Sequence, residues 1–204
     1  MHISEGVLSA PVLITGAAVC VAGVSIGLKK MDYNKLPKVA VLASAFFLAS
    51  LIHIPIGLSS VHMILNGVAG LLLGWTVFPA ILLAVALQAI LFQFGGLTTL
   101  GVNTCNMAIP AVLCYYFFRE GVKSNRSWIM VASAFSCGFF SVLLTCIMVA
   151  TALLATGEPF LAAGQVAVLA HIPVMVTEGI LTVSCVSFLR KVKPEMLDAP
   201  YVSV

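Results

Sequence analysis

The sequence predicts an all-α integral membrane protein with seven transmembrane helices, its N-terminus outside and its C-terminus in the cytoplasm. Hydrophobic residues make up 61% of the 204 positions and charged residues only 8%, whereas a soluble domain has about 25% charged residues. Long apolar runs recur along the chain, and a membrane-crossing helix takes about 20 residues. The basic residues fall in three short segments. These features predict a single transmembrane domain over residues 1–204.

Seven apolar runs define the expected spans, which are, in order, 8–28, 38–54, 61–74, 77–94, 103–118, 128–155 and 165–189. Most are separated by charged or polar stretches. The third and fourth runs are divided only by Gly74, Trp75 and Thr76, with Pro79 close behind. Glycine followed by proline favours a helix stop and a restart, so these runs are predicted to be two helices.

The positions of the basic residues set the orientation and support this count. They form three groups: Lys29, Lys30, Lys35 and Lys38; Arg119, Lys123 and Arg126; Arg190, Lys191 and Lys193. Short basic loops remain in the cytoplasm. With seven spans and an outer N-terminus, the groups follow spans one, five and seven, and all are cytoplasmic. Fusing the third and fourth runs would place two groups on the opposite side from the first.

The four histidines all fall at the outer ends of the predicted spans. His2 lies at the N-terminus, His53 ends the second span, His62 opens the third and His171 begins the seventh. Histidines that only fill the core would divide between the two sides of the membrane. The one-sided distribution therefore favours a site open to the exterior.

The start of the chain, Met1-His2, predicts a metal chelate. No basic segment typical of a signal peptide precedes the first apolar run, so Met1 is expected to be the mature N-terminus. Its α-amine, the backbone amide of His2 and the His2 Nδ1 can close a five- and a six-membered ring on one ion. The amide loses its proton only to a strongly acidic cation such as Ni²⁺, Cu²⁺ or, less readily, Co²⁺. Planar nitrogen ligation is typical of Ni(II) and Cu(II).

The fourth ligand position of such a chelate is open to a side chain from elsewhere. His62 is the preferred candidate, and the alternative is an interfacial histidine that hydrogen-bonds to water; spacing alone does not separate the two. Ser59 and Ser60 precede it and are suited to capping a helix. His62 is therefore expected in the first turn of the third span.

Three further features could contribute to the site. The polar segment 94–106, which contains Asn103 and Asn106, is expected to form a lid whose amides brace the N-terminal loop, with an ordinary surface turn as the alternative. Glu178 lies seven residues after His171 on one helix face; it is expected to be protonated or hydrogen-bonded to neighbouring helices rather than to bind metal. His171 is expected to orient His62 or the N-terminal loop. His53 is expected to pack at the interface.

These residues resemble a known family. The pattern is similar to that of the substrate-binding membrane subunits of cobalt and nickel energy-coupling-factor transporters, the CbiM/NikM family, and is closer to the nickel type. The matching segments cover nearly the whole chain: Met1-His2-Ile3 with Glu5-Gly6 and Leu8-Ser9, Ser59 to His62, Gly95 to Thr98, Asn103, Asn106-Met107, His171 to Pro173, Glu178-Gly179 and Phe188 to Leu197. One departure is Ser4, where proline is common in the family.

The resemblance implies a square-planar metal held by the Met1 amine, the His2 amide nitrogen, the His2 imidazole and His62. The residues expected to surround these ligands are His171, Asn103, Asn106 and Ser60.

The expected function is high-affinity binding of Ni²⁺, or Co²⁺, as the substrate of an ATP-driven importer in the cell membrane. The chain has no Gly-x-x-x-x-Gly-Lys-Ser/Thr phosphate loop, so other subunits must supply the energy. Implied partners are a membrane coupling subunit, two cytoplasmic ATPases, an optional small accessory membrane subunit and the lipid bilayer, but no nucleic acid.

Two alternatives to this function make different demands on the sequence. A stand-alone metal channel or carrier would place ionisable groups near the middle of the membrane, whereas the proposed ligands lie outside. An intramembrane metalloenzyme would need a general base beside the metal. No His-Glu-x-x-His motif occurs, and Glu178 is the only acid within a span. The chain is therefore not expected to be an enzyme.

Overall fold

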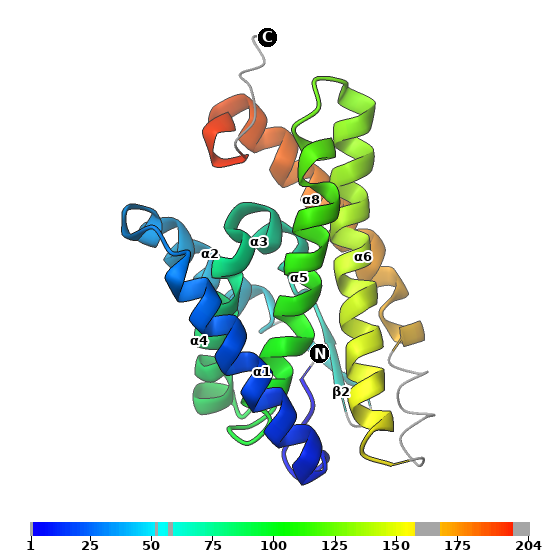
Figure 1. The fold of residues 1–204 in the computed structure, drawn as a ribbon. Helices are drawn as coiled ribbons and strands as arrows, with labels where there is room; N and C mark the ends of the chain where they lie inside the picture. The colour runs from blue at the N-terminus through cyan, green and yellow to red at the C-terminus, as the bar shows by residue number, and fades with distance from the viewer. Residues whose placement is uncertain (1, 52, 57–58, 158–167, 198–204) are drawn as a thin grey trace.

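The computed structural model describes residues 2–51, 53–56, 59–157 and 168–197. Apart from one β-hairpin, the regular structure in this part is helical (Figure 1). The α-helices are α1 (Ala10–Lys29), α2 (Leu36–Ala49), α3 (Asn66–Leu73), α4 (Val77–Phe92), α5 (Leu100–Val122), α6 (Ser127–Leu154) and α8 (Ile172–Val192). Short 3₁₀ turns cover Tyr33–Lys35, Gly74–Thr76 and Pro194–Leu197.

Four helical stretches among the described residues are long and apolar enough to cross a membrane. They are Ala10–Lys29, Asn66–Phe92, Ser127–Leu154 and Ile172–Val192. The outer surface of the bundle is also apolar: Ile14 is 70% exposed, Ile90 65% and Phe117 77%. Large apolar side chains spread over a surface mark contact with lipid or protein. The helical membrane class predicted from composition is confirmed.

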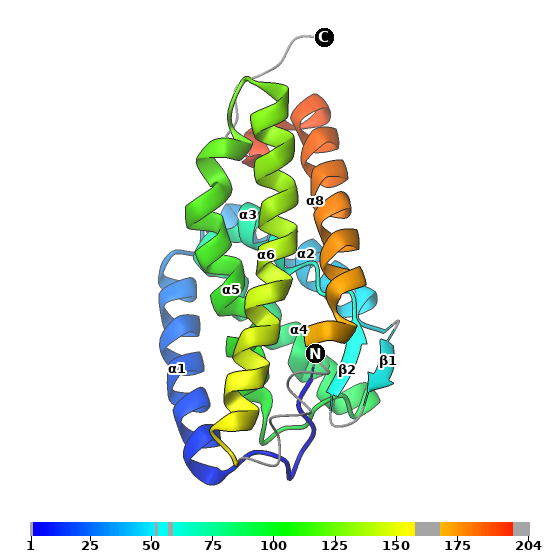
Figure 2. The same cartoon turned by 90° about the vertical axis from the view of Figure 1, so that its right-hand side faces the viewer.

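The chain reverses direction at Gly74, within the stretch Asn66–Phe92. Gly70 lies against Ala111 and Gly74 against Tyr115, so α3 runs parallel to α5. Gly74 has a φ of +53°, a conformation that glycine adopts without steric cost, and it ends α3. Helix α4 then returns toward the end of the molecule where the N-terminus lies (Figures 1 and 2). The third and fourth runs are thus two separate helices, as predicted.

The predicted third span differs from the structure in its first half. Strands β1 (His53–Ile56) and β2 (Ser59–His62) form an antiparallel hairpin between α2 and α3. His62 therefore lies in a strand opposite His53, and its predicted place in the first turn of a helix is wrong; α3 begins only at Asn66. His53 likewise belongs to β1 instead of ending a helix. The sequence from 52 to 62 contains Pro55 and several β-branched residues, which favour a strand edge over a helix.

All three basic groups lie at one end of the bundle. The Lys30 Nζ is 5.4 Å from the centroid of the Trp75 ring, in the turn between α3 and α4. Lys38 donates a hydrogen bond of 3.1 Å to the carbonyl of Met196. Arg190 donates one of 2.7 Å to a carbonyl in the loop between α5 and α6. The common location that the positive-inside argument requires is therefore present in the structure.

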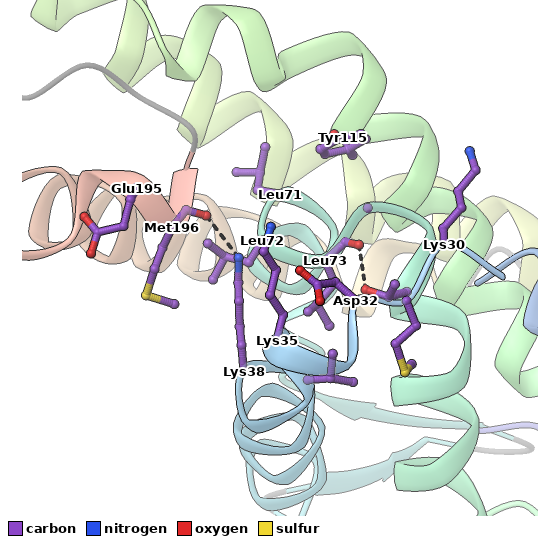
Figure 3. A pocket seen from close by; sticks show the side chains of 14 residues that line it. Lys30, Asp32, Lys35, Lys38, Leu71, Leu72, Leu73, Tyr115, Glu195 and Met196 are labelled. Atoms are coloured by element: carbon purple, nitrogen blue, oxygen red, sulfur yellow. Dashed lines mark hydrogen bonds between the residues drawn. The ribbon is translucent and has the colours of Figure 1, made fainter. Parts of the chain in front are cut away.

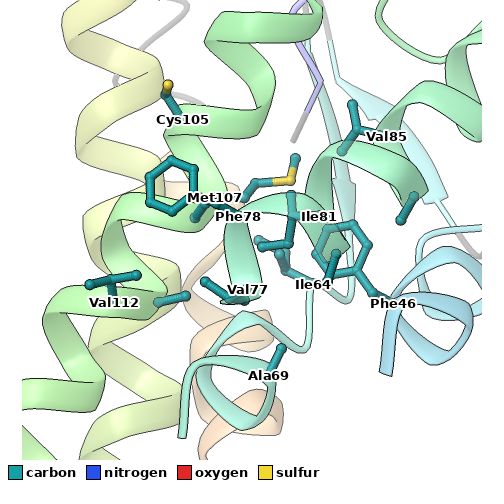
Figure 4. Close-up of a cluster of buried hydrophobic side chains, with 14 of the residues drawn as sticks. Phe46, Ile64, Ala69, Val77, Phe78, Ile81, Val85, Cys105, Met107 and Val112 are labelled. Atoms are coloured by element: carbon teal, nitrogen blue, oxygen red, sulfur yellow. The ribbon is translucent and has the colours of Figure 1, made fainter. Parts of the chain in front are cut away.

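A buried apolar cluster links the hairpin to the bundle. Ile64, two residues after β2, is fully buried and belongs to the same cluster as Phe46, Ile81 and Met107 (Figure 4). Side chains of this size each contribute about 1.5–3 kcal/mol when buried. The segment that follows His62 is thus held by packing against α2, α4 and α5.

Candidate metal site

The N-terminal segment folds into the protein. His2 is only 4% exposed and Ile3 is fully buried. Asn103, in the first turn of α5, pairs with both backbone groups of Ile3: the Ile3 N–H donates to Oδ1 at 2.9 Å, and Nδ2 donates to the Ile3 carbonyl at 3.1 Å. The Thr99 hydroxyl accepts a further bond of 3.1 Å from Nδ2. This network fixes the orientation of the amide and holds the chain directly after His2.

A second tether joins Glu5 to the loop between α4 and α5. The Glu5 N–H donates to the Gly95 carbonyl at 3.2 Å. Its carboxylate accepts bonds from the backbone N–H of Thr98, at 3.0 Å, and from the Thr98 hydroxyl, at 3.3 Å. The backbone bond from Thr98 lowers the pKa of Glu5. A Cβ on Gly96 would overlap the Glu5 side chain, so the close approach requires glycine at this position.

His2 and His62 lie against each other in this region. Their ring centroids are 5.0 Å apart and their planes differ by 19°. His2 also stacks on Phe94, with centroids 6.3 Å apart. His62 is 3% exposed. Two histidines that are 60 positions apart in the sequence are thus brought together in a buried pocket of rings.

The surroundings of His62 favour a neutral imidazole. Its Nδ1 is 2.8 Å from the carbonyl of Met63, so the proton lies on Nδ1 and the lone pair on Nε2. Burial is the main cause that holds the pKa of His62 well below its usual range, and the nearby rings of His2 and His171 lower it further. A neutral ring with a fixed tautomer is the form that binds metal ions.

The other predicted residues are placed as follows. His171 is fully buried and directly precedes α8. Its ring is one of the groups that lower the pKa of His62. Asn103 and Asn106 belong to α5 and not to a loop. Asn106 lines a cavity of about 540 Å³ between α1, α5 and α6, and its buried Nδ2 has no hydrogen-bond partner among the described residues. Met1 and the side chain of Ser60 lie outside the described part of the chain.

Glu178 holds the backbone of the segment that follows His62, a partner that the sequence did not predict. The side chain is fully buried, and Oε1 accepts bonds from the backbone N–H groups of Ile64, at 2.5 Å, and Leu65, at 2.8 Å. These donors stand at the start of α3, where N–H groups lack partners within the helix. The expected hydrogen bonding to a neighbouring element is present. Its partner, the segment directly after His62, was not predicted.

Comparisons with known proteins identify relatives along the whole chain. The family profile described as a cobalt uptake substrate-specific transmembrane region, CbiM, matches residues 2–196. A putative metal transport protein of Haemophilus influenzae is 41% identical over 97% of each chain. The cobalt transport protein CbiM of Kyrpidia tusciae is 31% identical over 97% of this chain and 86% of its own. The fused nickel transport protein NikMN of Rhodobacter capsulatus is also 31% identical, and this chain spans 64% of it.

The fold has been seen before. A crystal structure of a truncated transition metal transporter superposes with a TM-score of 0.74, with 24% identity over 93% of this chain and 98% of that one. The structural match covers 93% of the chain and the family profile covers residues 2–196, so both span nearly all of it. The chain therefore belongs to the CbiM family of cobalt and nickel uptake proteins, as a multi-pass membrane component of a transporter rather than an enzyme.

Proposed function

We propose that the chain is the high-affinity Ni²⁺, or Co²⁺, binding subunit of an ATP-driven importer of the energy-coupling-factor type. In this proposal the metal is captured from the outer side by the N-terminal Met-His chelate. The observation that carries the proposal is the burial of His2 against His62, with ring centroids 5.0 Å apart. A chain start with no binding role would be expected to lie exposed to water instead of buried against a second histidine.

The proposed ligands are the Met1 amine, the amide nitrogen and imidazole of His2, and the imidazole of His62. At metal–nitrogen distances near 2 Å, two ligand nitrogens on one ion lie about 3–4 Å apart. Two rings with the observed separation can reach this by rotation about their side-chain bonds. Asn103 fixes Ile3, the residue directly after the proposed amide ligand. His171, Ser60 and the loop before α5 would support the ligands.

The ligand set fits the composition of the site. In the described residues, no three His, Cys, Asp or Glu side chains gather as a metal cluster. The proposed chelate needs only two imidazoles, because its other two ligands are nitrogens of the chain start. Planar nitrogen ligation favours Ni²⁺ over cations that prefer oxygen or tetrahedral thiolate sites.

The orientation follows from the basic end of the bundle. Because short basic loops stay in the cytoplasm, this end is proposed to face inward and the His2–His62 pair outward. A membrane coupling subunit and two cytoplasmic ATPases would supply energy, with a small accessory membrane subunit as an optional fourth partner. Release would move the N-terminal segment away from His62, and reprotonation of the amide would favour dissociation.

The test is metal analysis of the purified protein with its native start and with three alanines added before Met1. The extension removes the amine from its position and places the histidine too far from the new N-terminus to rebuild a planar chelate, so nickel content is expected to fall to background. His2→Ala and His62→Ala should also lose nickel, while the thermal midpoint of the metal-free protein serves as the folding control. Equal nickel content with and without the extension would refute the chelate.

A second experiment separates the importer subunit from a stand-alone carrier. The chain is reconstituted alone in vesicles, and nickel uptake is followed over time. Binding without uptake is expected, because no ATPase is present. Sizeable transport by the isolated chain would contradict the proposal.

A further inference from the structure

A hollow of about 340 Å³ opens at the basic end of the bundle, away from the histidine pair (Figure 3). Its rim comes from the segment between α1 and α2 and from the C-terminal 3₁₀ turn, and its floor from the last turn of α3. Lys30, Lys35 and Lys38 stand on the rim, and Leu71 and Leu72 lie in the floor. A volume of this size lies within the range of about 300–1,000 Å³ that small-molecule sites occupy.

Lysine side chains stand at two edges of this hollow. Figure 3 shows the side chains of Lys35 and Lys38 next to each other on the edge where Met196 lies. Lys30 is at the opposite edge. In the described part of the chain, the ion pairs are those of Glu120 with Arg119 and Lys123, and neither Lys30 nor Lys35 pairs with a carboxylate. Neighbouring ammonium groups repel each other, so an anion between them would be stabilised.

Two acids also line the hollow and reduce this charge without cancelling it. Asp32 accepts a bond of 3.0 Å from the backbone N–H of Asn34, and Glu195 is exposed. Among the described residues that line the hollow, the charged side chains are three lysines and two carboxylates. The lining therefore suits a ligand with a compact negative group and, above the floor, an apolar part.

Aromatic residues place the hollow at the level of the membrane surface. Tyr115 is part of its wall, and Trp75 lies under the ammonium group of Lys30. Tryptophan and tyrosine concentrate at both membrane–water interfaces. A ligand in this hollow would thus be within reach of the lipid headgroups of the adjacent leaflet.

We propose that this hollow binds the phosphate group of an anionic phospholipid. Lysine binds phosphate as a point charge, and basic pockets between transmembrane helices hold anionic headgroups. The apolar floor formed by Leu71, Leu72 and Val39 would contact the glycerol and the first methylene groups. This site is independent of the proposed metal chelate at the other end, so either proposal can fail without the other.

The test measures the binding of phosphatidylglycerol and of phosphatidylcholine to the purified full chain by native mass spectrometry. The wild type is expected to retain phosphatidylglycerol preferentially. The double variant Lys30→Gln/Lys35→Gln should weaken this binding by roughly tenfold. The matched control Lys29→Gln/Lys191→Gln removes the same charge from exposed lysines at the same end that do not line the hollow, and it should bind within about twofold of wild type.

Further arms identify the source of the phosphate and guard against misfolding. Lys30→Arg/Lys35→Arg keeps the charge and should restore binding. If millimolar inorganic phosphate displaces the lipid, the site accepts the free anion as well; if it does not, the headgroup is the ligand, and both results support a phosphate site. The proposal is overturned if the two glutamine variants lose binding equally, or if the wild type does not distinguish the two lipids.

Discussion

At the residue scale, the geometry of the N-terminus depends on one amide. Asn103 donates to and accepts from Ile3, so no other side chain of similar size can replace both bonds: aspartate lacks the donor, and leucine lacks both groups. Because Ile3 adjoins His2, a loss of this pairing frees the residue that carries the proposed ligands. The position of His2 beside His62 therefore depends on the hydrogen bonds between Asn103 and Ile3 as well as on the two imidazole rings.

Asn103→Ala is therefore expected to weaken nickel binding by about 10- to 100-fold, the usual cost of removing a group that orients metal ligands. Titration calorimetry on the purified chain measures this change. Asn106→Ala, one turn further along α5 and facing the other cavity, should change the affinity by less than about threefold. An equal loss in both variants would mean that the effect arises from α5 as a whole.

The sequence could identify these residues but not their partners. Asn103 belongs to a segment that is expected to brace the N-terminal loop, because the segment is too polar to face lipid. Its partner, Ile3, is 100 positions away, and no local pattern specifies such a pairing. His2 and His62 could be grouped from their side of the membrane, whereas their stacking depends on packing around Phe94.

At the element scale, the hairpin and the short helix α3 replace one predicted span. An apolar run without clear periodicity does not distinguish a helix from a strand, and the run 61–74 is of this kind. The result is a helix of eight residues whose N-terminus lies inside the bundle. Non-helical backbone at such a depth persists only where protein satisfies its polar groups. Glu178 of α8 accepts the backbone hydrogen bonds of Ile64 and Leu65 in this way.

Glu178→Gln is expected to keep the fold and most nickel binding, because the amide oxygen can still accept both backbone bonds. Glu178→Ala leaves the buried N–H of Ile64 and the partly buried N–H of Leu65 without this partner, at about 1–3 kcal/mol for a buried group. It should lower the thermal midpoint and the nickel affinity together, since His62 precedes this segment by two residues. Thermal unfolding and calorimetry on the same samples check both quantities. If Glu178→Gln lost nickel as completely as His62→Ala, a direct role in ligation would replace this interpretation.

At the scale of the whole molecule, the two ends of the bundle have opposite chemistry. One end carries the basic groups, with Lys38, Arg190 and Lys30 tied to neighbouring elements. The other carries the buried histidine pair and the loop that clamps Glu5. This separation was predictable from the sequence, because the basic residues fall only in the predicted inner loops and tail and the histidines only at the predicted outer ends. Local sequence patterns do not show this separation, because the residues at each end of the bundle are far apart in the chain.

The proposed orientation predicts which loops are accessible from outside. Leu97, in the loop before α5, and Asn125, in the loop before α6, are both exposed and lie at opposite ends of α5. Leu97→Cys should react with a membrane-impermeant maleimide in intact spheroplasts, and Asn125→Cys only after permeabilisation. The unmodified chain gives the background, which should be low because five of its six cysteines are buried. The reverse labelling pattern would place the histidine pair on the cytoplasmic side, where the chain could not capture metal from outside.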